Sequence, residues 1–399
     1  MDPLIKTLDI MLTILTGYTV LISLCCVLPA KKHPVVPPKT KFAVLIPARN
    51  EESVLGTLIE SLRAQAYPDS LYDMYVIPNN CTDGTEEAAR TAGAKILHCT
   101  SPVSTKGEVL HQIFQQLRGH YDAYCVFDAD NIVDPAFLAR MNDAVIAGAQ
   151  VAKSRQCALN PYDSWISGCY DLYFQSINLL HSRARMPFPL SAKLVGTGFM
   201  VTDELLGQLK GWNTVTLTED IEFAAQCAML GKRVYYVPQA LTYDEEPLSF
   251  ATSMRQRWRW SAGVQSVANR YTGNLLKMRP SWLRWDLASH INMIYVQLLA
   301  FIPLIYGLLT LSLPKIFLTL GASVCSFTAG GIAMGLFLSV TAGRNPLKQW
   351  KSILLYPLFL ASWYPLHISA LFAKPKQWKP IPHGTASQRQ RNFHSHSYK

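Results

Sequence analysis

The sequence has few charged side chains for its length. Asp, Glu, Lys and Arg make up 16% of the 399 residues, whereas ordinary soluble domains contain about 25%. Hydrophobic residues make up 49% of the chain, and they are concentrated towards its two ends. This composition argues against a chain made only of soluble domains, and it predicts segments that lie in a membrane.

Cysteine pairs at the spacing of metal or redox sites are also missing. The nine cysteines are scattered, with no CxxC pair, and Cys25, Cys26 and Cys325 lie inside apolar runs. We therefore expect reduced thiols, most of them buried. The net charge of +10 is concentrated beside the apolar runs and at residues 255–259, where it favours anionic lipid headgroups or a polyanionic donor. No nucleic-acid-binding motif accompanies this charge, so we expect no nucleic-acid partner.

The first apolar segment lacks the features of a cleaved signal peptide. Ile10–Ala30 contains 21 residues without a charge, which span about 30 Å as a helix. No basic flank precedes the segment, and no small-residue cleavage site follows it. Lys31 and Lys32 follow instead, and basic residues favour the cytosolic side of a membrane. We expect residues 1–32 to be an uncleaved anchor and the domain after it to face the cytosol.

Three more apolar stretches follow late in the chain, at about Leu287–Leu313, Ile316–Gly343 and Ser352–Ala373. We expect residues 286–374 to form a transmembrane region of two or three spans, with a flexible basic tail at 375–399. Three complete spans would place that tail outside the cell, yet its lysines and arginines favour the cytosol. Since the third stretch also contains prolines, we expect it to be broken or re-entrant and to border a translocation path.

Two segments, Trp165–Arg185 and residues 250–285, combine aromatic residues with arginines at helical spacing. This pattern is typical of helices that lie in the membrane interface. Amphipathic helices packed on the core of the globular domain are the alternative interpretation.

Residues 33–249 form a mixed segment in which short apolar runs alternate with helical patterns. The expected strands are Phe42–Ile46, Met74–Ile77, Lys95–His98 and Tyr124–Phe127, and the expected helices are 51–65, 88–92, 109–117 and one that opens at Pro135. This alternation predicts an α/β domain with a mostly parallel sheet. Polar clusters follow three of the strands, at Ala48–Glu52, Asn79–Thr85 and Asp128–Asn131. Such sheets bind ligands at the carboxyl ends of their strands.

Asp128 and Asp130 follow directly after an apolar strand. Two carboxylates at this spacing suit a hard divalent cation such as Mg²⁺, which binds through one or two carboxylates and the phosphates of a substrate. The metal would ease the departure of a diphosphate leaving group. Capping of the helix at Pro135 is the alternative role, so this motif alone is weak evidence.

Glu219 and Asp220 begin another helical pattern. Acids are common in the first turn of a helix, so capping is again one interpretation. The functional interpretation is a general base that removes a proton from an attacking hydroxyl group.

Residues 256–260 form a QxxRW pattern. The arginine offers a diphosphate a permanently charged fork, and Trp260 offers a stacking face to a sugar. A helix on the membrane surface would explain these residues equally well. The ordered combination of the three motifs between membrane segments is far more specific than any one of them.

In this combination the chain resembles the family-2 inverting glycosyltransferases of the membrane polysaccharide-synthase type, such as cellulose, chitin and hyaluronan synthases. The resemblance covers residues 40 to about 265 by motif and the remainder by hydropathy. It implies a GT-A, Rossmann-like catalytic domain, a nucleotide-sugar donor, Mg²⁺ or Mn²⁺ as cofactor, and inversion at the anomeric carbon.

The resemblance also implies roles for individual residues. Asp128 and Asp130 would bind the metal, and Asp220 would act as the base, with Glu219 beside it. The nucleotide-sugar would contact Ala48, Glu51, Asn79, Asp83, Lys106 and Asp128. The acceptor and the diphosphate would contact Thr197, Gly198, Gln256, Arg259 and Trp260.

Asn79 departs from the family pattern, which usually has a carboxylate at this position to accept the uracil N–H. An asparagine carbonyl accepts the same hydrogen bond without the assistance of charge. We therefore prefer a UDP-sugar as donor, although Asn79 weakens that preference.

Two functions remain open within this resemblance. The preferred one is extension of a β-linked polysaccharide from a UDP-hexose or UDP-N-acetylhexosamine, with translocation of the polymer through the membrane helices. The alternative is transfer of one sugar to a membrane lipid, as in ceramide glucosyltransferases. An inactive scaffold protein is a third, remote possibility. We expect a location in a bacterial plasma membrane, and the sequence predicts no particular accessory subunit.

Overall fold

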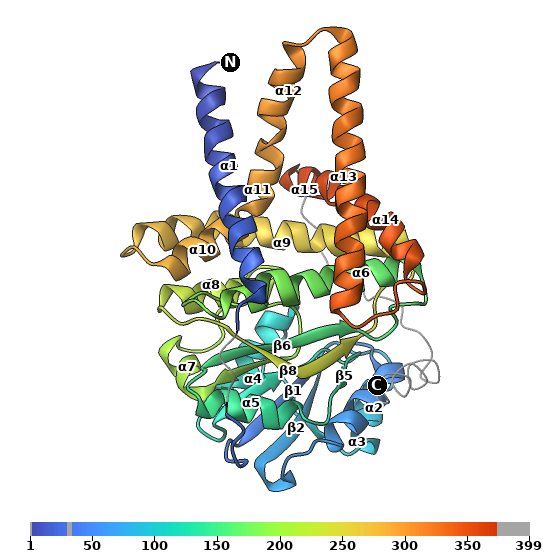
Figure 1. Cartoon of the computed structure of the whole chain (residues 1–399). Coiled ribbons are helices and arrows are strands. Elements are labelled where there is room, and N and C mark those ends of the chain that lie inside the picture. The colour runs from blue at the N-terminus through green and yellow to red at the C-terminus, as the bar shows by residue number, and fades with distance from the viewer. Residues whose placement is uncertain (1, 30–33, 373–399) are drawn as a thin grey trace.

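An eight-stranded sheet organises the part of the chain from Phe42 to Asp244 (Figure 1). The computed structural model describes residues 2–29 and 34–372, so the tail predicted at 375–399 lies outside the described residues. The strand order is β3-β2-β1-β4-β7-β6-β8-β5. The strands are β1 (Phe42–Ala48), β2 (Tyr72–Pro78), β3 (Lys95–Ile96), β4 (Ala123–Val126), β5 (Ile132–Val133), β6 (Val151–Ala158), β7 (Phe199–Thr202) and β8 (Tyr235–Asp244).

The first four strands of the sheet form the parallel, Rossmann-like arrangement that the sequence predicts. β1 pairs in parallel with β2 and with β4, and β2 pairs in parallel with β3. The other half is mixed, because β7 runs antiparallel to both β4 and β6, and β5 runs antiparallel to β8. The α/β fold class is confirmed, and the parallel pairing continues beyond β4 only between β6 and β8.

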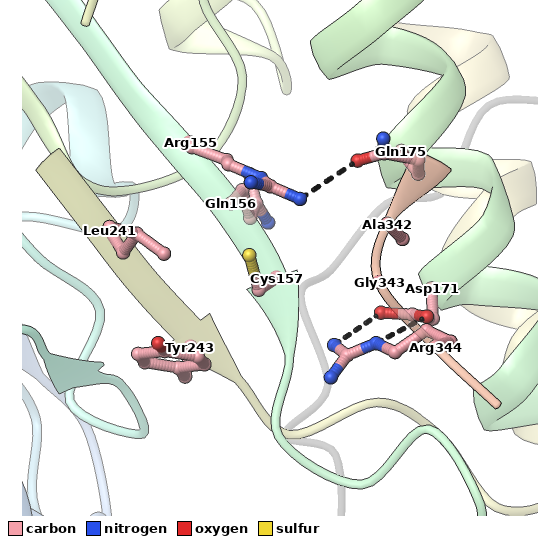
Figure 2. A pocket seen from close by; sticks show the side chains of 10 residues that line it. All are labelled: Arg155, Gln156, Cys157, Asp171, Gln175, Leu241, Tyr243, Ala342, Gly343 and Arg344. Atoms are coloured by element: carbon pink, nitrogen blue, oxygen red, sulfur yellow. Dashed lines mark hydrogen bonds and ion pairs between the residues drawn. The ribbon is translucent and has the colours of Figure 1, made fainter. Parts of the chain in front are cut away.

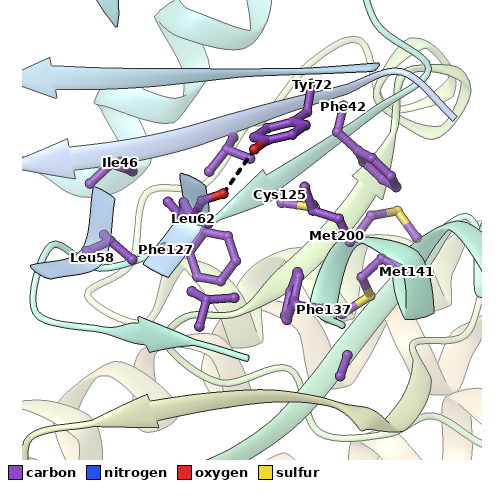
Figure 3. Packing of buried hydrophobic residues seen from close by; sticks show 14 of the residues in the cluster. Phe42, Ile46, Leu58, Leu62, Tyr72, Cys125, Phe127, Phe137, Met141 and Met200 are labelled. Carbon is purple, nitrogen blue, oxygen red and sulfur yellow. Dashed lines mark hydrogen bonds between the residues drawn. The ribbon is translucent and has the colours of Figure 1, made fainter. Parts of the chain in front are cut away.

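Helices cover both faces of the sheet. One face packs on α2 (Glu52–Arg63), α3 (Thr85–Thr91) and α5 (Phe137–Ile146), and the other on α4 (Lys106–Leu117), α7 (Asp203–Gln208) and α8 (Glu219–Met229). Side chains alternate between the faces along a strand, and Figure 3 shows Phe42 and Ile46 of β1 on the face that α2 and α5 cover. Burial on both faces explains why β1 is apolar throughout.

One helix boundary differs from the prediction. α5 begins at Phe137 rather than at Pro135. The Asp134 carboxylate accepts a hydrogen bond from the Ala136 N–H (2.9 Å), and the Asp134 carbonyl accepts one from the Phe137 N–H (3.0 Å). Pro135 therefore belongs to a turn that Asp134 closes, and the helix starts after it.

Two long helices separate the sheet from the apolar helices (Figure 1). α6 (Trp165–Ser176) continues as a π-helical segment over Ile177–Arg183, and α9 covers Phe250–Lys277. α6 is buried along most of its length and packs on β6, α13 and α14. These contacts favour the alternative of helices packed on the protein, while their position at a membrane interface stays a prediction.

The remaining helices are largely apolar: α1 (Pro3–Leu24), α10 (Trp282–Ile291), α11 (Met293–Leu299), α12 (Phe301–Leu309), α13 (Leu313–Thr341), α14 (Trp350–Ala361) and α15 (Trp363–Phe372). Among the described residues three helical segments are long and apolar enough to cross a membrane: Pro3–Val27, Leu313–Thr341 and Trp350–Phe372. A fourth is possible if the helices on either side of Asn292 form one span, although they meet at a bend of 54°. The stretch that we expected at Leu287–Leu313 is therefore bent.

The segment Trp350–Phe372 differs from the other two candidates. Its helix is interrupted at Ser362. In its apolar core of 18 residues, 44% is buried inside the protein, whereas the buried share is 11% in Pro3–Val27 and 6% in Leu313–Thr341. α14 packs on α13 and α6, and α15 packs on α9. These contacts fit the break expected from its prolines, and its path through a membrane stays a prediction.

A buried ion pair fixes the end of α13 to the globular domain. The Arg344 guanidinium donates to both oxygens of Asp171 on α6 (2.8 and 3.0 Å), beside a small cavity of about 180 Å³ between β6, β8 and α6 (Figure 2). The Asp171 side chain is 4% exposed and that of Arg344 is 12% exposed. The pair therefore couples the segment that follows α13 to α6.

We expect Asp171→Asn to destabilise the protein by about 3–5 kcal/mol, because it leaves Arg344 buried without its counter-charge. Thermal unfolding of the detergent-purified protein measures the effect as a midpoint lowered by several degrees. Asp69→Asn is the matched control, since Asp69 is exposed and surface changes cost less than about 0.5 kcal/mol. Equal midpoints for the two variants would show that the pair does not hold α13.

Candidate active site

A large cavity, of about 1180 Å³, extends from the carboxyl edge of the sheet to the apolar helices. Its wall begins at Ala48 and Asn79, at the ends of β1 and β2, and continues along α9. It ends among side chains of the apolar helices, which include Ile294 of α11, Phe327 of α13 and Trp363 of α15. The cavity therefore joins the ligand-binding edge of an α/β sheet to the membrane-facing part of the molecule.

The structure brings most of the predicted site residues to this cavity. Those that line it are Ala48, Glu51, Asn79, Lys106, Asp128, Asp130, Thr197, Glu219, Asp220, Gln256, Arg259 and Trp260. The two that do not line it are Asp83 and Gly198. Their roles, like those of the other residues, stay predictions; Asp83 is exposed and Gly198 is buried.

Asp83 and Gly198 both have a place in the local fold. The Asp83 carboxylate accepts hydrogen bonds from the N–H (3.1 Å) and the hydroxyl (2.5 Å) of Thr85 at the start of α3. Gly198 has a φ of +61°, and a Cβ there would overlap the side chains of Ser154 and Thr242. Only glycine therefore lets the chain pass so close to β6 and β8.

Lys106 is the basic centre of the sheet end of the cavity. A capping box formed by Thr105 and Glu108 fixes the start of α4, and Lys106 is its first residue. The Lys106 ammonium donates to the Asp128 carboxylate (2.6 Å) and lies 3.7 Å from the Glu219 carboxylate. Burial alone would lower the pKa of Lys106, but these two acids raise it above its usual value, so the side chain stays charged. A phosphate can therefore replace Asp128 as the partner of Lys106, and the ammonium stays paired with a negative charge.

Glu219 and Asp220 occupy the first turn of α8 and differ in their surroundings. Burial raises the pKa of Glu219 to about 7, although Lys106 opposes that change. The Asp220 carboxylate accepts hydrogen bonds from the N–H groups of Gly196 and Ile221, and the residue is 7% exposed. Backbone donors therefore orient Asp220 towards the cavity, and the helix N-terminus favours its negative charge.

Asn131 fixes the loop that carries the two aspartates. Its Oδ1 accepts hydrogen bonds from the Asp128 N–H (3.1 Å) and from the Thr197 hydroxyl. Its Nδ2 donates to the Asp244 carboxylate (2.9 Å). Asn131 is only 1% exposed and does not line the cavity, so its role is to hold these groups in one arrangement.

A second group of acidic and basic residues, which we did not predict from the sequence, lies beside this loop. Burial and the neighbouring Asp130 raise the pKa of Asp244 to about 8, and burial raises the pKa of Glu246 well above its usual value. Lys153 donates to the Thr197 carbonyl (2.7 Å), and burial lowers its pKa to about 8. The sequence signal for this group was the acidic run at 244–246, which lies at the end of a strand like the polar clusters that we did predict.

The carboxylates of this region suit a divalent cation. Asp128 and Asp130 face the cavity, and Asp244 lies near enough for its ionisation to be affected by Asp130. Within residues 2–29 and 34–372, no three His, Cys, Asp or Glu side chains form a complete metal site. Mg²⁺ needs only one or two carboxylates when phosphates supply other oxygens, so the oxygen donors present fit such an ion.

The QxxRW residues form the opposite wall, on α9. The hydroxyl of Tyr170 donates to the Gln256 side-chain oxygen (2.8 Å). The Trp260 ring stacks against the Trp363 ring, with 6.4 Å between the ring centroids. Arg259 forms no hydrogen bond or ion pair with any residue that the structure describes, so its guanidinium is available to a ligand. Arg257, in contrast, is fully buried and donates to the Phe359 carbonyl (3.0 Å).

A glycine sets the distance between the two walls. A Cβ on Gly263 of α9 would overlap the side chain of Thr218, the residue before Glu219. The close approach of α9 to this loop places Trp260 and Asp220 on one cavity. Acidic, basic and aromatic side chains therefore surround one space.

Comparisons with known proteins agree with this geometry. A family model described as "Glycosyltransferase like family 2" matches residues 37–263. The chain is 27% identical over 259 residues to the probable glycosyltransferase YdaM of Bacillus subtilis, a match that covers 62% of this chain and 60% of that protein. It is 23% identical over 382 residues to the beta-monoglucosyldiacylglycerol synthase of Synechocystis, covering 88% of this chain and 76% of that protein.

A solved structure shares the fold. The mannosyltransferase PcManGT of Pyrobaculum calidifontis, in complex with GDP-Man and Mn²⁺, has a TM-score of 0.62 and 16% identity. The similarity covers 93% of this chain and 100% of that chain. At this identity the likeness supports the expected GT-A fold and carries no information on the substrate.

Proposed function

Because this chain belongs to glycosyltransferase family 2, we propose that it transfers one sugar from a nucleotide-sugar to a hydroxyl group of a membrane lipid. The observation that carries the proposal is the continuity of the cavity. The same space is lined by Asp128 and Asp220 at its sheet end and by Ile294 and Phe327 among the apolar helices. A polar donor and an acceptor held in the bilayer can meet there.

Residues of the sheet edge and of α9 would bind the donor. Asn79 would accept a hydrogen bond from the nucleobase, and Lys106 and Arg259 would bind the diphosphate with charge-assisted hydrogen bonds. Asp128 and Asp130 would hold Mg²⁺ or Mn²⁺. When bound, such an ion neutralises negative charge on the diphosphate as it leaves.

Asp220 would serve as the base for a single displacement. Its carboxylate takes the proton of the acceptor hydroxyl while the hydroxyl oxygen attacks the anomeric carbon. The bond from that carbon to the diphosphate breaks, and the electron pair leaves with the nucleoside diphosphate. One displacement inverts the anomeric configuration, in agreement with the sequence-based expectation.

The exposure of the helices favours a lipid acceptor over the polysaccharide that we first preferred. The most apolar windows of Pro3–Val27 and Leu313–Thr341 are only 11% and 6% buried. Among the described residues these two segments therefore have little packing against protein, whereas a tunnel for a polymer needs helices that pack around it. The extensive match to a lipid glucosyltransferase supports the same choice.

Polysaccharide synthesis remains the second candidate function. Trp260 lines the cavity, and an aromatic ring there can stack on the last sugar of a growing chain. A cytosolic catalytic domain at a bacterial plasma membrane is the proposed location for either function.

Incubation of the purified protein in lipid vesicles with a panel of labelled UDP- and GDP-sugars tests the proposal. We expect one donor to give labelled material that partitions into chloroform–methanol. Label that stays in a water-soluble or insoluble polymer, and that a glycan hydrolase releases, would contradict the lipid acceptor.

A further inference from the structure

We infer that Lys193 and His290 form an anion subsite that binds the phosphate of the acceptor, which is therefore a phospholipid with a hydroxyl group on its head. The inference rests on the proposed function and names the class of lipid that the cavity accepts. The roles expected from the sequence include neither residue.

The two side chains come from separate elements and line the same cavity. Lys193 lies in the segment between the π-helical turn and β7, and His290 lies near the end of α10. The His181 ring packs on the His290 ring with centroids 4.2 Å apart, which supports His290 from behind. The subsite therefore has a defined wall on the membrane-facing side of the catalytic residues.

Lys193 brings a positive charge that no described residue neutralises. Its ammonium has no hydrogen bond to a described side chain or carbonyl, and no described carboxylate lies within 4.0 Å of it. The nearby Arg185 is already paired with Asp286 at 2.8 Å, and both side chains are 2% exposed. Burial lowers the pKa of Lys193 to about 8, which reflects the cost of a desolvated charge without a partner. A bound anion would remove that cost.

The position of Asp220 indicates what kind of molecule supplies the anion. Among the acids, Asp220 is the one that raises the pKa of Lys193, yet the two side chains form no ion pair within 4.0 Å. Both line the cavity, so a ligand can lie between them. An acceptor with its hydroxyl at Asp220 and a phosphate a few bonds away at Lys193 fits this arrangement.

The apolar end of the cavity identifies the source of the phosphate. Met293, Ile294 and Phe327 line the same cavity as His290, and they suit the acyl chains of a lipid. The diphosphate of the donor has separate cations in this proposal: Lys106 at the sheet end of the cavity and Arg259 on α9. A phosphate that reaches Lys193 from the membrane side is therefore part of a lipid headgroup.

Vesicles of phosphatidylcholine that contain equal amounts of either phosphatidylglycerol or diacylglycerol test the inference, since only the first carries both a phosphate and a headgroup hydroxyl. The full-length protein is assayed with its preferred donor. We expect Lys193→Gln to lower the ratio of kcat/KM for phosphatidylglycerol to that for diacylglycerol by about 10- to 100-fold, as loss of a charge-assisted hydrogen bond does. Lys193→Arg should restore most of the ratio. Lys277→Gln, which removes an exposed lysine at the end of α9, should leave it unchanged.

Each other outcome has a definite meaning. A fall in donor affinity in Lys193→Gln, measured with the nucleoside diphosphate alone, would assign Lys193 to the donor and overturn the subsite. Equal use of both lipids by wild type and variant would also overturn it, while single transfer to a lipid would stand. Inhibition of the wild type by free inorganic phosphate to the same extent in both vesicles would show a phosphate site that is not part of a lipid site. A polymer as sole product would overturn the proposed function and the subsite together.

Discussion

Replacement of Asp220 with asparagine is expected to lower the rate of sugar transfer by about 10²- to 10⁴-fold, the contribution of a positioned general base. The variant keeps the size of the side chain and removes only its ability to take a proton. The N–H groups of Gly196 and Ile221, which orient the Asp220 carboxylate, can still donate to the asparagine carbonyl. The fold and the donor site should therefore survive.

Two measurements separate this prediction from a structural effect. Initial rates with saturating donor should fall, while the dissociation constant of the nucleoside diphosphate should stay within about twofold of the wild-type value. Glu219→Gln is the matched control in the same helical turn, because Glu219 contacts Lys106 and is not the proposed base. A larger loss of activity in Glu219→Gln than in Asp220→Asn would show that Asp220 is not the base.

Removal of divalent cations has the second largest expected effect. We expect EDTA to stop transfer and Mg²⁺ or Mn²⁺ to restore it, because Lys106 and Arg259 alone leave much of the diphosphate charge unbalanced. Asp130→Asn should lower kcat/KM by about 10²-fold or more, as loss of an electrostatic contact to a leaving group does, and higher metal concentrations should recover part of that loss.

A neighbouring aspartate provides the control for the metal prediction. Asp134 caps the turn before α5, and asparagine caps a helix about as well as aspartate. Asp134→Asn should therefore keep both its activity and its metal dependence. Full activity in EDTA, or equal losses in Asp130→Asn and Asp134→Asn, would rule out the metal role of Asp130.

The sequence predicts the residues that belong to short motifs, because local spacing alone identifies them. Asp128, Asp220 and Arg259 are each recognisable from their neighbours in the chain, and the structure places all three on one cavity. The parallel order of β1, β2 and β4 also follows from local alternation, because a parallel pair needs a helical crossover between its strands.

Features that depend on long-range packing were not predictable in this way. Asp244 reaches the Asp128 loop because β8 pairs with both β5 and β6, and no local pattern indicates these partnerships. The sequence around Lys193 contains no motif. Its place on the cavity depends on the packing of α10, whose His290 lines the same space. The bend at Asn292 was hidden because hydropathy measures how apolar a segment is, not its direction. For Asp83 the motif predicted contact with the nucleotide-sugar. In the structure its carboxylate accepts hydrogen bonds from Thr85 and so stabilises the loop that carries it.

The number of sugars on each lipid tests the central claim most directly. Intact-mass measurement of the product made by the purified protein in lipid vesicles provides this number. Because one cavity brings a donor to a lipid hydroxyl, we expect a single mass increment of one sugar, present in wild type and absent in Asp220→Asn. A ladder of many increments, or a carbohydrate product with no lipid attached, would contradict single transfer to a membrane lipid.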